Sequence, residues 1–302
     1  MNKQWGAWIL VLIALIVSAG LLFIDSQSSQ GLLNSFDTGK PETIKPPAAI
    51  VKEESVPKPE LEPIEPAALE KETVVTQAVD IPEPEPVPVP AADPFLVVID
   101  PGHQAKANLD QEPIGPGAAE TKYKVTGGTT GIVTKKPEYV LNLEAAQLLK
   151  SALEARDMKV ILTRTTNDVD MSNSERAAVA NDNEADLFVR LHADGSENPA
   201  TSGFSVLIPA KENPYTSAIF ADSELAANHV IQAVSADIPL HQTGIFYRDD
   251  MSGFNWSKVP VILPEIGFMT NAEEDQNLSD PAYLTNVMNL LADGIVQYAN
   301  NN

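Results

Sequence analysis

Two histidines and two glutamates occupy positions from which they could meet in one site. His103 follows the apolar run Phe95–Ile99 and the turn residues Asp-Pro-Gly, His192 follows the apolar run DLFVRL, and Glu265 follows VPVILP. Glu138 stands at the predicted start of a helix, directly after a proline. Because ligands bind at the carboxyl ends of strands in open α/β sheets, we expect these four side chains to converge on one edge of a sheet.

Two imidazoles and one carboxylate form a ligand set that suits zinc. They leave a tetrahedral zinc ion with one open position, which is typical of hydrolytic sites where the metal acidifies its bound water towards neutrality. The chain contains no cysteine, so thiolate sites and disulfide frameworks are excluded and any metal must be held by His, Asp or Glu. The sequence permits a zinc site of this kind without proving it.

Each of these residues also has a purely structural interpretation. A histidine after a strand can simply hydrogen-bond a turn, and this applies to His103 and His192. Glu138 in the first turn of a helix could complement the helix macrodipole, an effect worth about 0.3–1 kcal/mol. Glu265 is harder to explain in this way, because apolar residues flank it on both sides and an unpaired buried carboxylate is unfavourable. We expect it to meet a proton, a metal or a substrate amide.

Three further polar residues, His229, His241 and Asn142, are weaker candidates for the site. His229 lies inside a predicted helix and His241 follows Pro-Leu, so we expect ordinary structural roles for both. Asn142 comes one helical turn after Glu138 and could lie near it, although an exposed asparagine would fit the sequence equally well.

Predicted strands and helices alternate from Phe95 onwards. Such alternation predicts an α/β fold, a single doubly wound domain with a mostly parallel sheet flanked by helices. The long segment Gln104–Pro137 is rich in Gly and Thr and is too long for a simple connection, so we expect a functional loop. The predicted strands are 95–99, 158–162, 186–191, 204–208 and 259–263, and the predicted helices are 137–152, 174–181, 215–234 and 283–298.

The first 94 residues differ in composition from the rest of the 302-residue chain. Trp5–Ile24 contains 20 residues without a charge, about the length that crosses a bilayer as a helix, so we expect residues 1–25 to be a transmembrane signal-anchor, with a cleaved signal as the alternative. Residues 26–94 hold 13 of the 24 prolines and many glutamates, which predicts a disordered linker. Residues 95–302 would then be a catalytic domain on the extracytoplasmic side of the plasma membrane, because a lysine precedes the apolar run and an aspartate follows it.

The formal net charge of −22 restricts the kind of partner. Proteins that bind nucleic acid need a basic surface to neutralise phosphates. The strongly acidic composition therefore argues against a nucleic-acid partner.

Phe95–Asn302 resembles the zinc-dependent N-acetylmuramoyl-L-alanine amidases represented by bacterial autolysins and spore-cortex amidases. The resemblance rests on VVIDPGH, KPEYVLNLEAAQLLKSAL, LTRTTND, SERAAVAN, DLFVRLHAD and VPVILPEIGFMTN, which occur in the family's order. It implies a zinc site made of His103, Glu138 and His192. It also implies that Glu265 is the catalytic acid/base, and that the substrate is the amide joining the lactyl group of N-acetylmuramic acid to L-alanine in peptidoglycan.

The chain departs from the family pattern in places that leave the implied ligands intact. Gln104 stands where the family often has glycine, and the SIHAN-like stretch reads VRLHAD, with Arg190 and Asp194. Glycan or stem-peptide preference could differ for this reason, and the segment 104–137 is another place where specificity could be set.

These observations favour a membrane-anchored peptidoglycan hydrolase. In such an enzyme zinc would activate water while a glutamate served as general base and then as acid to the leaving amine. Two other hypotheses remain open: a catalytically inactive wall-binding or regulatory module with the same fold, and a zinc peptidase acting on the stem peptide. An inactive module would be expected to have lost one of the four site residues, and all four are present.

Overall fold

The computed structural model describes residues 93–301 of the chain. The predicted signal-anchor, residues 1–25, and all but the last two residues of the predicted linker lie outside this part. The predicted localisation at a membrane is wrong. Within residues 93–301 no helix is both long and apolar enough to cross a bilayer. The longest helix of this part, α7 (Pro281–Ala299), carries polar residues such as Asn286 and Asp293 along its length.

A six-stranded sheet forms the centre of the described residues, with the strand order β4-β1-β5-β8-β6-β7. β4, β1, β5 and β8 run parallel to one another, whereas β6 pairs antiparallel with β8 and parallel with β7. The predicted α/β fold with a mostly parallel sheet is therefore confirmed. The strands are β1 (Leu96–Pro101), β4 (Lys159–Leu162), β5 (Leu187–Asp194), β6 (Phe204–Pro209), β7 (Leu240–Arg248) and β8 (Val261–Phe268).

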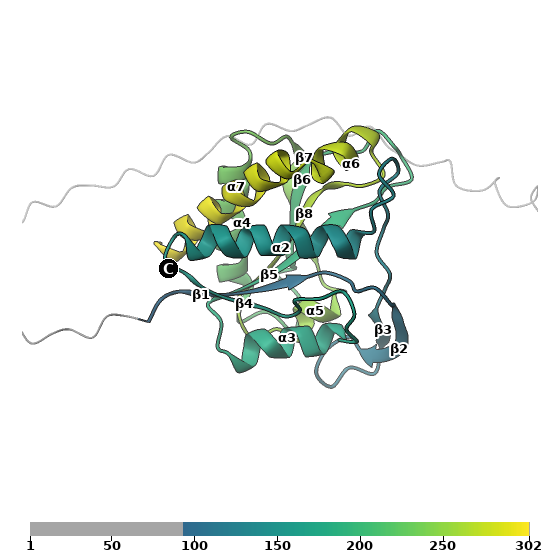
Figure 1. Cartoon of the computed structure of the whole chain (residues 1–302). Helices are drawn as coiled ribbons and strands as arrows, with labels where there is room; N and C mark the ends of the chain where they lie inside the picture. Colours follow the sequence, from purple (N-terminus) through teal and green to yellow (C-terminus); the bar gives the residue numbers. More distant parts are fainter. Residues whose placement is uncertain (1–92, 302) are drawn as a thin grey trace, which may run out of the picture. The chain divides into compact units, whose positions relative to one another are not determined.

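Helices cover both faces of this sheet because successive side chains of a strand point to opposite faces. Val97 and Ile99 of β1 belong to one core cluster, packed against α2, α4 and α7. Val98 lies in a second cluster with residues of α3 and α5, and Figure 1 shows α3 on the opposite side of the sheet from α2. The helices are α2 (Glu138–Glu154), α3 (Asn173–Asp182), α4 (Phe220–Val234), α5 (Ser252–Asn255), α6 (Ala272–Ser279) and α7.

Two strands extend further than the sequence predicts. The expected stops before His192 and at Pro264 do not occur, and both His192 and Glu265 lie inside their strands. β8 continues past Pro264 because it has a strand on each side: β5 pairs with it through His192 and Glu265, and β6 pairs with it through Ser205 and Glu265. The two predicted site residues are therefore fixed by the sheet and not by a turn.

The segment between β1 and α2 contains a hairpin that the sequence did not reveal. β2 (Asn108–Pro113) pairs antiparallel with β3 (Thr121–Val125). Most side chains of the two strands are exposed or half-buried, so neither strand contains the buried apolar run that identifies the central strands, although Tyr123, Lys124 and Val125 alternate in polarity. No strand is predicted over residues 240–248 either, where β7 lies, because its side chains are also mostly exposed or half-buried. In Figure 1 the hairpin lies beside the carboxyl ends of the strands.

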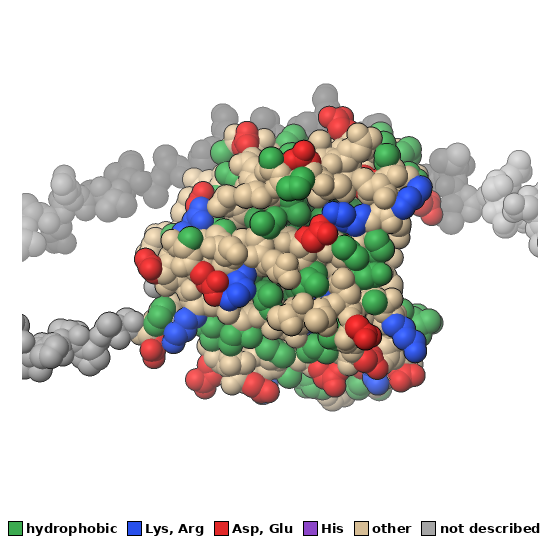
Figure 2. Space-filling view, viewed as in Figure 1, with side chains coloured by type: hydrophobic (Ala, Val, Ile, Leu, Met, Phe, Trp, Pro, Cys, Tyr) green, Lys and Arg blue, Asp and Glu red, His purple; other side chains and the backbone are tan. Residues whose placement is uncertain are grey.

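The surface of the domain agrees with its acidic composition. Figure 2 shows acidic and basic side chains interspersed among apolar and neutral ones, without a continuous basic patch on the face that carries α2 and α7.

Candidate metal centre

His103 leaves β1 in a left-handed backbone conformation, with φ of 59°. Its Nδ1 lies 2.9 Å from the carbonyl oxygen of Thr126, which follows the β2–β3 hairpin. Its Nε2 lies 3.2 Å from Glu138 Oε1. In the neutral imidazole, Nδ1 must carry the proton in order to donate to a carbonyl, and Nε2 then keeps its lone pair. The segment after the hairpin therefore selects the nitrogen of His103 that could bind a metal.

Glu138 is the first residue of α2 and is almost fully buried. Its Oε2 accepts a hydrogen bond from the backbone N–H of Thr129 at 2.8 Å, and its Oε1 accepts from Ala193 N at 3.2 Å. Asn142 Nδ2, one turn along the helix, donates to the same Oε1 at 3.1 Å. Donors from three parts of the chain thus fix this carboxylate. A glutamate that only complemented the helix dipole would not need these three hydrogen bonds.

His192 and Glu265 are direct neighbours across the parallel strands β5 and β8. His192 Nδ1 lies 3.1 Å from Glu138 Oε1. The ring nitrogens and carboxylate oxygen that His103, Glu138 and His192 offer to a metal all lie within 4.8 Å of one another. Glu265 lines the same pocket, which has a volume of about 480 Å³. The four side chains singled out in the sequence therefore come together at one site, and three of them form a candidate metal site.

The protonation states of two of the three candidate ligands, His192 and Glu138, suit metal binding. Burial lowers the pKa of His192 to about 4, so this imidazole is neutral at pH 7. Burial would raise the pKa of Glu138, but its hydrogen bonds with His103 and His192 hold that pKa well below the usual range. Burial would lower the pKa of His103, but the hydrogen bond and the negative charge of Glu138 outweigh burial and raise that pKa. A metal requires a neutral imidazole and an ionised carboxylate of its ligands, and His192 and Glu138 already have these states.

The pKa of Glu265 is shifted in the opposite direction to that of Glu138. Burial, reinforced by the negative charges of Glu138 and Asp194, raises its pKa well above the ordinary value. Its Oε2 is buried and has no hydrogen-bond partner among the described residues. A buried carboxylate left unpaired in this way is unfavourable unless it exchanges a proton or meets a ligand.

Two glycines let the cluster pack at this density. A Cβ atom at Gly102 would lie 2.3 Å from His192 Nε2, and a Cβ at Gly128 would lie 2.6 Å from Glu138 Oε2. Gly128 also has a φ of 74°, which side chains disfavour. Gly128 belongs to the Gly-rich segment 104–137, and Gly102 to the Asp-Pro-Gly-His turn.

A second buried cluster supports the backbone beneath His103. Asp100, the last but one residue of β1, is fully buried and pairs with Arg176 at 2.7 Å and Arg190 at 3.1 Å. Arg176 donates to the carbonyls of Pro101 and His103. Arg164 adds hydrogen bonds to the carbonyls of Pro101 and Gly102. Sequence reasoning assigned none of this, although Asp100 stands in the motif that it singled out.

Of the other polar residues, some lie beside the four site residues and others lie away from them. Asn142 is fully buried and bonded to Glu138, so the alternative of an exposed asparagine is wrong. His241 lies at the start of β7 with Nδ1 3.0 Å from the carbonyl oxygen of Ser202, and His229 lies within α4. Neither of these histidines lines the pocket. Asp194 does line it, whereas Arg190 pairs with Asp100.

Comparison with known proteins identifies the family of the chain. The sequence pattern of the N-acetylmuramoyl-L-alanine amidase family matches residues 97–297. An N-acetylmuramoyl-L-alanine amidase of Mycobacterium tuberculosis is 29% identical over 215 residues, which cover 68% of this chain and 86% of that protein. The amidase AmiA of Escherichia coli is 26% identical over 67% of this chain and 75% of its own length.

A solved structure shares the fold. The crystal structure of the amidase Ami1 from Mycobacterium smegmatis superposes with a TM-score of 0.64 at 26% identity, covering 69% of this chain and 98% of the other. Since the family pattern spans well over half of the chain, and the folds agree, the chain belongs to the N-acetylmuramoyl-L-alanine amidases, hydrolases that cleave the bond between N-acetylmuramic acid and L-alanine in peptidoglycan.

Proposed function

We propose that this chain cleaves the N-acetylmuramoyl-L-alanine amide with one zinc ion held by His103, Glu138 and His192. Glu265 acts as the general base and then as the general acid. The catalytic domain comprises residues 95–302, within which the family match falls.

The observation that supports this proposal most directly is the meeting of two histidines on one carboxylate oxygen. His103 Nε2 and His192 Nδ1 lie 3.2 and 3.1 Å from Glu138 Oε1. Two imidazole nitrogens and a carboxylate oxygen are the donor set of catalytic zinc sites that keep a position open. When bound, zinc supplies a Lewis acid for the amide carbonyl and acidifies water.

The chain's own groups hold the ligands and move the proton. The carbonyl of Thr126 and the donors around Glu138 orient the ligand atoms, which reduces the ordering needed when a metal binds. The buried Oε2 of Glu265 takes a proton from the attacking water, because its raised pKa makes it a stronger base than an exposed carboxylate. Glu265 then passes this proton to the amine of L-alanine as the bond to the lactyl carbonyl breaks.

Three variants of the purified protein separate the two roles. Glu138→Ala and His192→Ala each remove a ligand, so both should lower the zinc content as well as the rate. Glu265→Gln keeps the side-chain volume and removes the proton acceptor. It should keep its zinc and its melting temperature while turnover falls by roughly 100-fold or more, the usual contribution of general base catalysis being about 10²–10⁴.

Zinc content, melting temperature and release of the new amine from peptidoglycan are measured on all three variants. If Glu265→Gln hydrolyses at nearly the wild-type rate, or loses its zinc, Glu265 is not an acid/base outside the metal ligands. A loss of melting temperature without a loss of rate would assign it to a structural role instead.

A further inference from the structure

A second cavity has a volume of about 600 Å³. β3, the carboxyl end of β7 and the start of α5 contribute to its lining, and so does Arg190 of β5. The charged residues that line it are Lys122, Arg190, Arg248 and Asp250.

The cavity and the metal centre share structural elements. Thr126, whose carbonyl accepts from His103, also lines the cavity. Arg190 and His192 stand two residues apart on β5, so they project from the same face of the sheet about 6–7 Å apart along the strand. A molecule that places its reacting amide at the metal centre can therefore reach this cavity with a group a few bonds away.

The cavity is cationic in a strongly acidic protein. Arg248 binds Asp250 through two hydrogen bonds of 2.8 and 3.0 Å, and Lys122 Nζ lies 2.8 Å from the same carboxylate. One carboxylate thus faces two cations, all of them partly exposed to the cavity. Arg190 adds a third positive charge, because its partner Asp100 is shared with Arg176.

Hydrogen-bond donors remain free at this surface. Among the described residues, Arg190 Nε and Nη2 are bonded to Asp100 and Asn173, while its Nη1 has no partner. Arg190 is only 3% exposed and still lines the cavity. Gly253 makes this possible, since a Cβ there would lie 1.7 Å from Arg190 Nη1. The Nη1 of Arg248 is likewise unpaired, and charged donors of this kind bind carboxylates strongly.

We propose that this cavity binds a free carboxylate of the peptidoglycan stem peptide and thereby selects the peptide that leaves. The inference rests on the proposed function of the neighbouring site. In peptidoglycan the lactyl group of the sugar is tied up in the scissile amide, so the free carboxylates of the substrate belong to the peptide. A cationic cavity beside the scissile bond therefore recognises the peptide side and not the glycan side.

The test compares two substrates that differ only in charge. One is a disaccharide–tetrapeptide muropeptide with its free carboxylates, and the other is the same muropeptide after carbodiimide amidation of those groups. With zinc-loaded full-length protein, kcat/KM should be about 10-fold or more higher for the free acid, since a hydrogen bond to a charged group contributes a factor of this size. The difference should lie mainly in KM.

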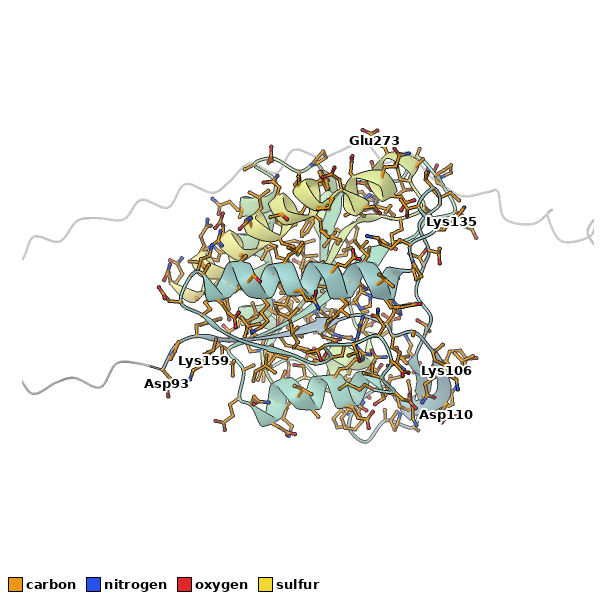
Figure 3. The ribbon with its side chains drawn as sticks, viewed as in Figure 1. Asp93, Lys106, Asp110, Lys135, Lys159 and Glu273 are labelled. Carbon is orange, nitrogen blue, oxygen red and sulfur yellow. The ribbon has the colours of Figure 1, made fainter. Side chains whose placement is uncertain are left out.

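Variants locate the preference in the cavity. Arg248→Gln and Lys122→Gln each remove one cation and leave Asp250 paired with the other. Each should reduce the free-acid preference several-fold while changing kcat/KM for the amidated substrate by less than about twofold. Lys159→Gln is the matched control, because Lys159 lies at the far end of the sheet from the hairpin region marked by Lys106 (Figure 3). It should leave the preference unchanged.

The outcomes distinguish the two proposals. Equal hydrolysis of both substrates by the wild-type protein, or a loss on Arg248→Gln that is the same for both, would overturn the carboxylate site and leave the zinc mechanism standing. Failure of the zinc-loaded wild type to cleave either muropeptide would overturn the mechanism together with this inference. Melting temperature and zinc content confirm that each variant is folded, and Lys122→Gln decides the case if Arg248→Gln is not.

Discussion

Two buried polar clusters lie close together in this domain, and they differ in how completely their groups are paired. In the cluster around Asp100, both carboxylate oxygens accept hydrogen bonds, from Arg176, Arg190 and Thr163. In the metal centre, His192 Nε2 and Glu265 Oε2 are buried without a partner among residues 93–301. The first cluster resembles the interior of any stable protein, and the second leaves groups free for chemistry.

The difference shows that one cluster supports the backbone and the other carries the reactive groups. Buried polar groups that are fully bonded rigidify a structure, whereas unpaired ones are unfavourable and persist where function requires them. Arg176 and Arg164 donate to the carbonyls of Pro101 and Gly102, so the bonded cluster holds the chain on which His103 stands. The bonded cluster therefore fixes the backbone that carries one of the candidate metal ligands.

The largest effect expected is that of removing the metal. A strong chelator should reduce hydrolysis of peptidoglycan to the background rate, and added zinc should restore it, because no other group of the site supplies a Lewis acid. The circular dichroism spectrum should stay native throughout, since the bonded cluster and the core do not include the ligands. Unfolding on chelation would show instead that the two clusters form one cooperative unit.

Removing the carboxylate at the centre of the bonded cluster should have the next largest effect. Asp100→Asn leaves Arg176 and Arg190 buried without a counter-charge, so the free energy of unfolding should fall by about 3–5 kcal/mol. Denaturant titration measures this loss. Asp110→Asn is a matched control, because Asp110 is 76% exposed and its ion pair with Lys124 is long, at 3.6 Å, so that change should stay within about 0.5 kcal/mol.

The same carboxylate should contribute a smaller, pH-dependent effect. Burial opposes its ionisation, but the charges of Arg176 and Arg190 and the hydrogen bond from Thr163 hold the pKa of Asp100 well below the ordinary value. A lowered folded-state pKa stabilises the protein above the unfolded pKa of about 3.9, and this stability is lost as the pH falls towards the folded value. The stability difference between wild type and Asp100→Asn should be constant above about pH 5 and shrink below about pH 4. If the difference grew on acidification, the pKa of Asp100 would be raised in the folded state and not lowered.

The smallest of these effects concerns the residue that joins the clusters. Gln104 is buried, and its Oε1 accepts from Arg176 and from Met171 N. Gln104→Ala leaves these donors with one partner fewer and should lower stability by about 1–3 kcal/mol. Turnover should change little, because Arg176 still bonds the carbonyl of His103. A large loss of rate with normal stability would mean that Gln104 itself touches the substrate.

The sequence was informative where a residue's surroundings are set by local pattern. The apolar run into Asp-Pro-Gly-His identified β1, and Pro137 before Glu138 identified the start of α2. The convergence of His103, Glu138 and His192 followed from the rule that ligands gather at the carboxyl edge of a parallel sheet.

The sequence was silent where long-range pairing decides. β7 carries few buried side chains and exists through its pairing with β6, a separate segment of the chain. β2 and β3 pair with each other across a short turn, but most of their side chains are exposed or half-buried, so no buried apolar run marks them as strands. The continuation of β8 past Pro264 depends on β5 and β6 on either side. The pairing of Asp100 with Arg176, 76 residues away in the chain, leaves no trace in a single sequence.

The placement of Glu265 inside β8 determines which changes of chain length the protein tolerates. Side chains alternate between the two faces of a strand, so deleting one residue between Val261 and Glu265 would turn the carboxylate to the opposite face and bury it in the core under α4 and α7. The turn between β2 and β3 is closed by a hydrogen bond from Ile114 N to Glu120 O. Its residues do not alternate between two faces of a sheet, so a change in its length does not reverse the direction of a side chain. Insertions there would enlarge or reshape the rim of the neighbouring cavity without moving His192 or Glu265. New substrate preferences can therefore arise in this protein through changes of loop length at the hairpin, while the spacing within β5 and β8 must stay constant.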